Sequence, residues 1–353
     1  MVKQNIAILF GGKSEEHEVS CRSAKYIFEN VDRDKYRPFL IGIDKLGNYY
    51  YMKECNIEHL IDCTWTDFIE TNEVCFSKGD ERFTLQLQGE KIVFDVVFPA
   101  LHGPNGEDGK LQGLMEFVNI PYVGCNSISS AICMDKEITK RLVGIEGIRQ
   151  VPYVILYEGV VAEEKLLEME EIGYPLFVKP ANMGSSVGVS KAENQQELLQ
   201  AIRVASKYDD KVIVEKGIDA LELEIAALGD EKDAYFSTVG CIKPRDIFYD
   251  YDSKYLTNDA DFYIPAPISF EKETELREMA RKAYTAMLCE GLSRIDFFMD
   301  KETQEIYFNE INTMPGFTAI SLYPQLMDYD GVGAKELIGR LIDYAWKRYE
   351  KNK

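Results

Sequence analysis

The chain has 353 residues, more than one core of about 150 residues requires, so two or three domains are expected. Its 60 acidic and 40 basic residues give a formal charge of -20, which argues against a general nucleic-acid surface. The apolar content of 46% is that of a globular protein, and the longest apolar runs, such as Ile92–Leu101, are too short to cross a bilayer. The N-terminus shows no cleavable leader pattern, so we expect a cytoplasmic protein without a membrane partner.

The first part of the chain predicts an open α/β sheet. Ile6–Phe10 is a short apolar strand that ends in Gly11-Gly12, and an amphipathic helix carrying Val19, Ala24 and Ile27 follows. Ligands of open α/β folds bind beside such turns, although this turn lacks the GxGxxG of a dinucleotide site. Further strands are expected at Arg37–Ile43, Tyr49–Met52, Phe83–Leu87 and Lys91–Phe98, with a variable surface excursion over Lys53–Glu81.

A loop rich in glycine follows the last of these strands. Leu101–Gly109 contains three glycines, a proline and His102, a composition expected of a rigid functional loop. His102 either serves a ligand or only completes the hydrogen bonds of the loop. A helix at Leu111–Val118, a strand at Pro121–Val123 and a helix from Ser127 to about Val143 come next, with a domain boundary near residue 126.

The next segment predicts a phosphate-binding loop. Lys136 and Lys140 share one helical face, and a strand ending at Lys179 runs into Gly184–Gly188, with the sequence GSSVG. Glycine and serine let backbone N–H groups approach phosphate, while the lysine adds a positive charge. The loop differs from GxxxxGK[ST] because no helix follows it directly, and a flexible hairpin tip remains the alternative.

Two glutamates and an aromatic segment follow. Glu215 and Glu222 lie on predicted strands and could accept from an adenine amino group and ribose hydroxyls, unless they are only exposed acids. Residues 246–261 are both aromatic and charged and lie between Pro244 and Pro265, a composition that favours an ordered lid over a linker.

Charged residues in a hairpin give the strongest chemical signal. Arg294 and Asp296 are two residues apart, as are Glu310 and Asn312, so each pair should point to one face of extended chain. Carboxylates and an amide oxygen without thiol or imidazole are suited to Mg²⁺ or Mn²⁺ shared with phosphate. The alternative is a solvated hairpin with a surface salt bridge.

Cysteine and histidine usage points away from disulfides and zinc. Eight cysteines are scattered without a CxxC, so we expect reduced core thiols. Only three histidines are present, and we find none spaced with cysteine as a ligand set, so zinc is not expected.

Seven motifs in order resemble the D-alanyl-D-alanine ligases of the ATP-grasp superfamily. They are ILFGGKSEEHEVS, FPALHGPNGEDGKLQG, ICMDKEITK, FVKPANMGSSVG, VEKGIDALELEIAALG, FYDYDSKY and RIDFFMD…FNEINTMPGFTAISLYP. The resemblance implies an α/β fold of three domains: a Rossmann-like N-terminal domain over 1–125, a central ATP-grasp subdomain over 126–216, and a C-terminal ATP-grasp subdomain over 217–353 with its lid loop at about 246–261. ATP would lie between the last two.

The implied reaction is ATP-dependent ligation of two D-alanines to D-alanyl-D-alanine, with release of ADP, through a D-alanyl phosphate in peptidoglycan precursor synthesis. Tyr255 and Leu322 match the D-alanine pattern. A D-alanyl-D-serine or D-alanyl-D-lactate ligase and a catalytically silent nucleotide-binding homologue are the alternatives. Members of this family are commonly homodimers through the N-terminal domain.

The resemblance also assigns roles to residues. The implied metal ligands, for two Mg²⁺ or Mn²⁺ ions, are Asp296, Glu310 and Asn312. The implied catalytic residues are Glu16, Ser185, Tyr255, Arg294, Gly316 and Ser321, and those near the amino acids are His102, Ser321 and Leu322. The implied ATP-binding residues are Lys136, Lys179, Ser186, Glu215, Lys216, Ile218, Glu222 and Lys254.

Overall fold

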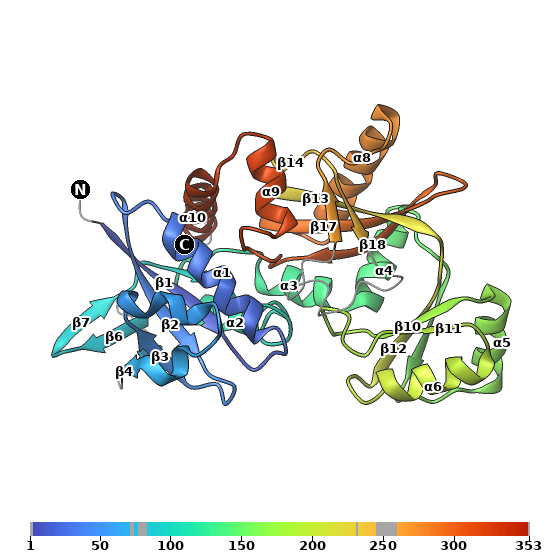
Figure 1. The fold of residues 1–353 in the computed structure, drawn as a ribbon, viewed down its shortest axis with the longest axis horizontal. Coiled ribbons are helices and arrows are strands. Elements are labelled where there is room, and N and C mark those ends of the chain that lie inside the picture. The colour runs from blue at the N-terminus through green and yellow to red at the C-terminus, as the bar shows by residue number, and fades with distance from the viewer. Residues whose placement is uncertain (1–2, 71–73, 77–82, 231, 245–259, 352–353) are drawn as a thin grey trace.

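The computed structural model of the chain describes residues 3–70, 74–76, 83–230, 232–244 and 260–351. Within these ranges the fold is α/β, with three larger sheets, each packed against helices, and one small sheet (Figure 1). None of the helices in the described part of the chain is long and apolar enough to cross a membrane.

The first sheet has the order β4-β3-β2-β1-β8, and β1 pairs in parallel with both β2 and β8. Its strands are β1 (Gln4–Gly11), β2 (Tyr36–Ile43), β3 (Tyr49–Met52), β4 (Ile69–Glu70) and β8 (Val96–Pro99). Helix α1 (His17–Asn30) packs on β1 through its buried face, as the apolar spacing predicts. The small sheet consists of β5 (Val74–Phe76), β6 (Phe83–Leu87) and β7 (Glu90–Val93).

Two predictions in this region are wrong. The strand expected over Lys91–Phe98 is two strands, β7 and β8, which belong to different sheets. The expected surface excursion contains two short 3-10 helices, η1 (Glu54–Leu60) and η2 (Trp65–Phe68). Leu60 and Trp65 are fully buried, so this segment contributes to the core although it lacks helical or strand periodicity. Of the strand expected at Pro121–Val123, the structure shows one bridge, between Val97 and Tyr122.

Two helices replace the single helix predicted from Ser127 to about Val143. After α2 (Lys110–Phe117), the chain forms α3 (Ser127–Met134) and α4 (Lys136–Ile145). Asp135 is extended between them, and its carboxylate accepts from the backbone N–H groups of Glu137 and Ile138. The helix restarts there because Asp135 supplies an N-cap.

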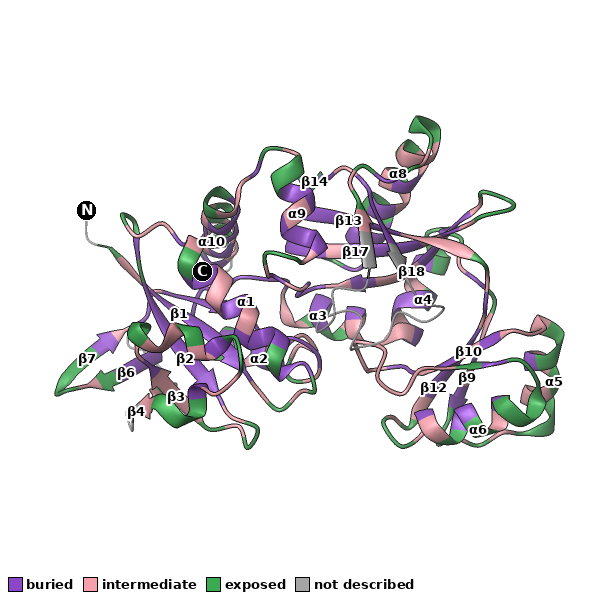
Figure 2. Cartoon of the chain, viewed as in Figure 1, coloured by how far each residue is buried: buried purple, intermediate pink, exposed green. Residues whose placement is uncertain are grey.

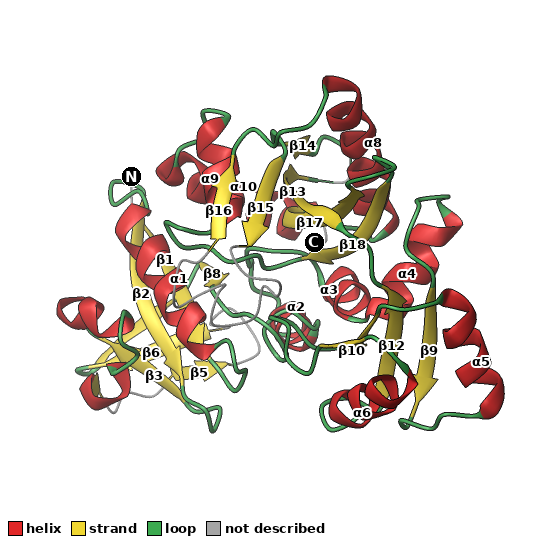
Figure 3. Ribbon diagram, turned by 45° about the vertical axis from the view of Figure 1, so that its right-hand side comes forward, coloured by secondary structure: helices red, strands yellow, loops and turns green. Residues whose placement is uncertain are grey.

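The second sheet is antiparallel, with the order β11-β10-β12-β9. Its strands are β9 (Tyr153–Tyr157), β10 (Leu176–Pro180), β11 (Ser190–Ala192) and β12 (Lys211–Lys216). The helices α5 (Glu163–Ile172) and α6 (Gln195–Ala205) lie on one side of it (Figure 3). A separate buried cluster of apolar residues joins this sheet to α5 and α6.

The third sheet has the order β16-β15-β13-β17-β18, with β14 paired to β13. Its elements are β13 (Ala220–Gly229), β14 (Tyr235–Phe236), β15 (Gly240–Pro244), β16 (Ala260–Tyr263), β17 (Gly291–Asp300) and β18 (Ile306–Asn312). Helix α8 (Phe270–Ala286) packs on this sheet, and α9 (Leu322–Tyr329) and α10 (Ala334–Lys351) complete the chain. One buried cluster includes residues of α1, β8, α9 and α10, so the C-terminal helices share a core with the first sheet (Figure 2).

All eight cysteines are free. Cys21, Cys125, Cys133, Cys241 and Cys289 are buried, as expected of core thiols. Cys55 and Cys75 are exposed and Cys63 is half-buried, so for these three the expectation of a core position is wrong.

Candidate active site

The β17–β18 hairpin presents four polar side chains on one face. Arg294 is opposite Asn312 and Asp296 is opposite Glu310 in the strand register, which confirms the alternation predicted from the sequence. The intervening Ile295 is fully buried on the other face. The apolar face therefore fixes which side chains reach the pocket, because a register shift of one residue would expose the core residues.

The carboxylate of Asp296 is the centre of this face. Arg294 donates to its two oxygens at 2.8 and 2.7 Å, and Asn312 Nδ2 donates to Oδ2 at 2.9 Å. The same guanidinium lies 2.8 Å from Glu224 Oε2. Glu310 lies 3.6 Å from the Lys136 ammonium. A cationic side chain thus lies beside each carboxylate of the predicted metal site. The potential ligands are oxygen atoms, without sulfur or imidazole, and such a set fits Mg²⁺ or Mn²⁺.

Glu224 is a site residue that sequence reasoning missed. It is 6% exposed and lies opposite Asp296 in the register of β13 and β17. The available signal was its spacing from Glu222, because residues two apart in a strand share a face. Both glutamates line the same pocket.

A buried carboxylate between two lysines lies next to the hairpin. Glu215 Oε1 is 2.7 Å from Lys140 Nζ, and its Oε2 is 2.5 Å from Lys179 Nζ. Burial opposes ionisation of Glu215, but the two lysines outweigh it and lower its pKa to about 2. Burial lowers the pKa of Lys140, whereas Glu215 and Glu310 outweigh burial at Lys179 and raise its pKa. Glu215 is therefore a fixed anion, and not the exposed acid of the alternative interpretation.

The glycine-rich segment after β10 makes contacts with both halves of the chain. Lys136, the first residue of α4, donates to the carbonyl of Met183 at 2.7 Å. The hydroxyl of Ser185 donates to the carboxylate of Glu16, which is 6% exposed at the start of α1. A Cβ on Gly184 would lie 3.1 Å from Glu16 Oε2. A side chain at this position would displace the Glu16 carboxylate, so glycine allows the loop to lie against the N-terminal part of the molecule.

His102 is buried with both ring nitrogens engaged. Nε2 lies 2.9 Å from Ser23 Oγ, and Nδ1 lies 2.9 Å from the carbonyl oxygen of Met314. Burial lowers its pKa, so the ring is neutral at pH 7. The histidine completes hydrogen bonds, as one interpretation expected, and it also lines the pocket.

Glu107 is a second residue that sequence reasoning did not single out, although it lies within one of the motifs. Its Oε1 accepts from the backbone N–H of Gly103 at 2.8 Å. Burial, with a smaller contribution from the nearby Glu16 carboxylate, raises its pKa to about 8. Glu107 is thus mainly protonated at pH 7, while it lies in the same pocket as Glu16.

The segment after the hairpin closes the pocket. Ser321 Oγ accepts from the backbone N–H of Thr318 at 3.1 Å and lies 2.7 Å from Thr318 Oγ1. A Cβ on Gly316 would lie 2.9 Å from Ser321 Oγ, so a side chain there would disturb the hydroxyl. Leu322 is 4% exposed and begins α9.

One pocket collects most of the predicted site residues. Those that line it are Glu16, His102, Ser185, Glu222, Arg294, Asp296, Glu310, Asn312, Gly316, Ser321 and Leu322. Lys179 reaches its edge, since its Nζ lies 3.4 Å from Oδ1 of Asn309, which lines the pocket. Lys216 directs its ammonium to the carbonyls of Gly173 and Tyr174.

Not all predicted residues reach the lining of this pocket. Five described residues lie outside it, at the start of α4, on the loop after β10, at the end of β12 and just beyond: Lys136, Ser186, Glu215, Lys216 and Ile218. Lys254, Tyr255 and most of the predicted lid over 246–261 fall outside the described residues.

Two solved structures resemble the whole chain. The VanG D-Ala:D-Ser ligase from Enterococcus faecalis matches with a TM-score of 0.85 and 37% identity, covering 98% of this chain and 100% of that one. The D-alanine-D-alanine ligase from Coxiella burnetii matches with a TM-score of 0.87 and 32% identity, covering 99% and 96%. These neighbours confirm the predicted ATP-grasp α/β fold.

Sequence comparison agrees over the full length. The D-alanine–D-alanine ligase of Caldicellulosiruptor bescii is 44% identical over 363 residues, covering 100% of this chain and 98% of the relative. That of Streptococcus pneumoniae is 44% identical over 352 residues, covering 99% and 98%. A family model described as the D-ala D-ala ligase N-terminus matches residues 5–125, and one described as the C-terminus matches residues 142–343. The chain therefore belongs to the D-alanine–D-alanine ligase family.

Proposed function

We propose that the chain joins two D-alanines to D-alanyl-D-alanine and converts ATP to ADP and phosphate. The observation that carries the proposal is the pocket itself, in which Glu16 and Ser185 face the Arg294, Asp296 and Glu310 cluster. A carboxylate that can hold an ammonium group lies in one cavity with a guanidinium and a hard-oxygen ligand set. Phosphorylation of an amino acid carboxylate needs these three elements together.

Activation of the first D-alanine is the first step of the proposed reaction. The carboxylate of Glu16 holds the substrate ammonium, and the Ser185 hydroxyl keeps Glu16 in place. The substrate carboxylate attacks the terminal phosphate of ATP and becomes D-alanyl phosphate. Arg294 and the backbone N–H of Gly316 stabilise the negative charge on the transferring oxygens, a contribution that typically amounts to about 10²–10³ in rate for one donor.

The amine of the second D-alanine then attacks the acyl phosphate carbon, and phosphate leaves. Ser321 is proposed to bind the second carboxylate, and Leu322 to limit the size of the second side chain. The neutral His102 lies near the first D-alanine. Tyr255 of the lid joins Glu16 and Ser185, and closure of the lid protects the acyl phosphate from water.

Nucleotide and metals are assigned to neighbouring residues. Lys136, Lys179 and Lys254 meet the phosphates, and Ser186 supplies a further contact from the loop. Glu215, Glu222 and backbone atoms of Lys216 and Ile218 bind adenosine. Asp296, Glu310 and Asn312 would hold two Mg²⁺ or Mn²⁺ ions, which neutralise charge on the phosphate oxygens.

The domain arrangement and cellular context complete the proposal. The three units are residues 1–125, 126–216 and 217–353, with ATP between the last two. A homodimer through the N-terminal unit and a cytoplasmic role in cell-wall precursor synthesis are expected from the family.

A second candidate is ligation of D-alanine to D-serine. The 37% identity and full coverage of the VanG D-Ala:D-Ser ligase favour it as the alternative. The side chains differ by one hydroxyl, which an apolar subsite rejects only weakly, by a factor of about 10². Leu322 supplies an apolar wall at the pocket, so D-alanine is the preferred second substrate.

A competition assay tests both candidate reactions. The protein is incubated with ATP, Mg²⁺ and equal amounts of D-alanine, D-serine and D-lactate, and products are separated by mass spectrometry. We expect D-alanyl-D-alanine to dominate. A dominant mixed dipeptide or depsipeptide would replace the proposed substrate, and failure to release phosphate or form any product would leave only a nucleotide-binding protein.

A further inference from the structure

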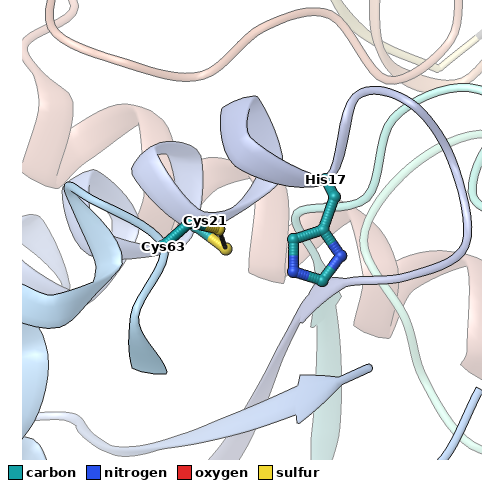
Figure 4. A group of neighbouring side chains, drawn as sticks. All are labelled: His17, Cys21 and Cys63. Carbon is teal, nitrogen blue, oxygen red and sulfur yellow. Dashed lines mark hydrogen bonds between the residues drawn. The ribbon is translucent and has the colours of Figure 1, made fainter. Parts of the chain in front are cut away.

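A cluster of two thiols and an imidazole lies outside the proposed active site. His17 and Cys21 are four residues apart and project from the same face of α1, and Cys63 meets them from the loop between η1 and η2 (Figure 4). Cys21 Sγ and Cys63 Sγ are 3.0 Å apart, and the ligand atoms of the three residues lie within 4.8 Å of one another. The sequence expectation that no histidine is spaced with cysteine overlooked this pair on α1.

The two thiols differ in exposure. Cys21 is fully buried, whereas Cys63 is half-buried. Cys63 has a φ of 60°, in the left-handed region, and the turn around it is held by Asp62 Oδ1, which accepts from the Thr64 hydroxyl at 2.8 Å. Of the two residues, Cys63 is the one that retains exposure to solvent, and Cys21 Sγ lies 3.0 Å from its sulfur.

The charges around the pair favour a thiolate on Cys63. The hydrogen bond with Cys21 and the nearby His17 lower the pKa of Cys63 to about 6, against the opposing effects of burial and Glu18. Burial raises the pKa of Cys21, and Glu18 acts in the same direction. At His17 burial lowers the pKa and Lys45 adds to this, but contacts with Cys63 and the Gly12 carbonyl outweigh both and raise it.

A metal ion fits this cluster less well than a sulfur–sulfur bond. Two thiolates on one tetrahedral zinc lie about 3.8 Å apart, given a Zn–S distance of about 2.3 Å. The separation here is shorter. The imidazole of His17 is also engaged, with Nδ1 2.7 Å from the carbonyl oxygen of Gly12 and Nε2 3.3 Å from the donating Nε1 of the buried Trp65.

We propose that Cys63 and Cys21 form a disulfide when the protein meets hydrogen peroxide. The Cys63 thiolate attacks one peroxide oxygen, the O–O bond breaks, and the leaving hydroxide takes up the proton that the Cys63 thiol had released, so that one water forms and Cys63 becomes a sulfenic acid. The Cys21 sulfur then attacks Cys63 Sγ, the S–O bond breaks, and the Cys21 proton leaves with the hydroxyl as water. Two thiols are oxidised and one peroxide is reduced to two waters.

The position of the bond gives it a consequence for the pocket. It would join the second turn of α1 to the loop after η1, and Glu16 is the N-cap of this helix, five residues before Cys21. Glu16 accepts a hydrogen bond from the Ser185 hydroxyl, so the disulfide would lie less than two helical turns from a contact between α1 and the loop after β10.

Thiol oxidation is measured at pH 6. At this pH about half of a thiol with a pKa near 6 is present as thiolate, whereas well under 1% of an ordinary thiol is ionised. The nucleophilicity of a thiolate falls with its pKa, and this offsets part of the gain, so we expect Cys63 to react about tenfold faster than a thiol of ordinary pKa. Wild-type protein is treated with peroxide, quenched by alkylation, and mapped by mass spectrometry. A peptide that links Cys21 to Cys63 is the expected product.

Variants separate the two steps. Cys21→Ser should stop at a sulfenic acid on Cys63 that dimedone traps, Cys63→Ser should form neither product, and Cys55→Ser serves as the control and should behave as wild type. Absence of the peptide that links Cys21 to Cys63 from the peroxide-treated wild-type protein would overturn the proposal, whether or not the variants fold. Stoichiometric zinc in the purified protein, with both cysteines protected until the zinc is chelated, would overturn it as well.

Discussion

Replacement of Lys140 by methionine should destabilise the second sheet without touching the pocket lining. Lys140 is 1% exposed and Glu215 is 3% exposed, so neither charge is solvated. Glu215 holds Lys140 at 2.7 Å through one oxygen and Lys179 at 2.5 Å through the other. The substitution leaves a buried carboxylate with one cation, and methionine fills much of the lysine volume without leaving a large cavity.

The magnitude follows from the Glu215 carboxyl. Its pKa falls from 4.5 to about 2, and at 1.36 kcal/mol per unit the ionised carboxyl contributes about 3 kcal/mol as the net of opposing burial and the two lysines. Because this pKa is depressed, the contribution is complete above about pH 4.5 and is lost as the pH falls towards 2. The lowered pKa of Lys140 shows that its own burial offsets part of the gain. Loss of one partner of a buried pair costs about 3–5 kcal/mol, and Lys179 remains, so we expect a loss of about 2–3 kcal/mol.

Hydrogen exchange measured by mass spectrometry is the suitable assay. Both tryptophans, Trp65 and Trp346, lie outside the second sheet, so their fluorescence does not report on it. Exchange of amides in β10 and β12 gives the opening free energy of the sheet directly. The expected result is a decrease of about 2–3 kcal/mol at pH 7 in Lys140→Met.

Two further variants make the result specific. Lys165→Met removes a lysine that pairs only with the exposed Glu168 on α5, which packs on the same sheet, and should change the opening free energy by less than about 0.5 kcal/mol. Lys140→Met combined with Glu215→Gln removes the stranded carboxylate but also takes from Lys179 its Glu215 partner, so it should restore only part of the loss. An opening free energy for Lys140→Met within about 1 kcal/mol of wild type would refute the reasoning, because the buried carboxylate would then not depend on its lysine.

Three other outcomes are expected. Glu107→Gln keeps an acceptor for the Gly103 N–H. Because the pKa of Glu107 is raised to about 8, the stability of the wild-type protein should fall as the pH rises from 4.5 to about 8, so the thermal midpoint of the variant should rise relative to wild type over that interval. A difference between the two midpoints that does not change with pH would contradict this. Arg294→Met should lower dipeptide formation by about 10²–10³ while nucleotide binding by fluorescence titration persists, and a loss below tenfold would exclude the donor role. Ser185→Ala should raise KM for the first D-alanine more than KM for ATP, whereas the control Ser190→Ala should leave both KM values unchanged. An equal rise of both KM values in Ser185→Ala would argue for general damage to the loop.

Local patterns explain which parts of the fold could be predicted. The hairpin of β17 and β18 was predictable because strand alternation places Arg294 and Asp296 on one face whatever the rest of the chain does. The break between α3 and α4 could have been found, since Asp135 is a strong N-cap residue in front of a helical run. The burial of Leu60 and Trp65 could not, because short 3-10 helices carry no apolar period.

The features of the site that the sequence did not predict depend on contacts between residues far apart in the chain. The sequence placed Lys136 and Lys140 on one helical face but could not tell which of them would be buried against Glu215 on another element. Glu107 was hidden for the same reason, because its pKa depends on burial and on Glu16, which lies far from it in the sequence.

These charges together give a reason for metal dependence in the proposed reaction. In the described part of the chain, carboxylates around the pocket outnumber cations: Glu16, Glu215, Glu222, Glu224, Asp296 and Glu310 against Lys136, Lys140, Lys179 and Arg294. The lysines are already paired with some of these acids, so they cannot by themselves neutralise a nucleotide triphosphate. An acidic chain with charge -20 repels such an anion further. Divalent cations held by Asp296, Glu310 and Asn312 would reverse that balance, which is why ATP affinity should collapse on removal of Mg²⁺ even though every lysine stays in place.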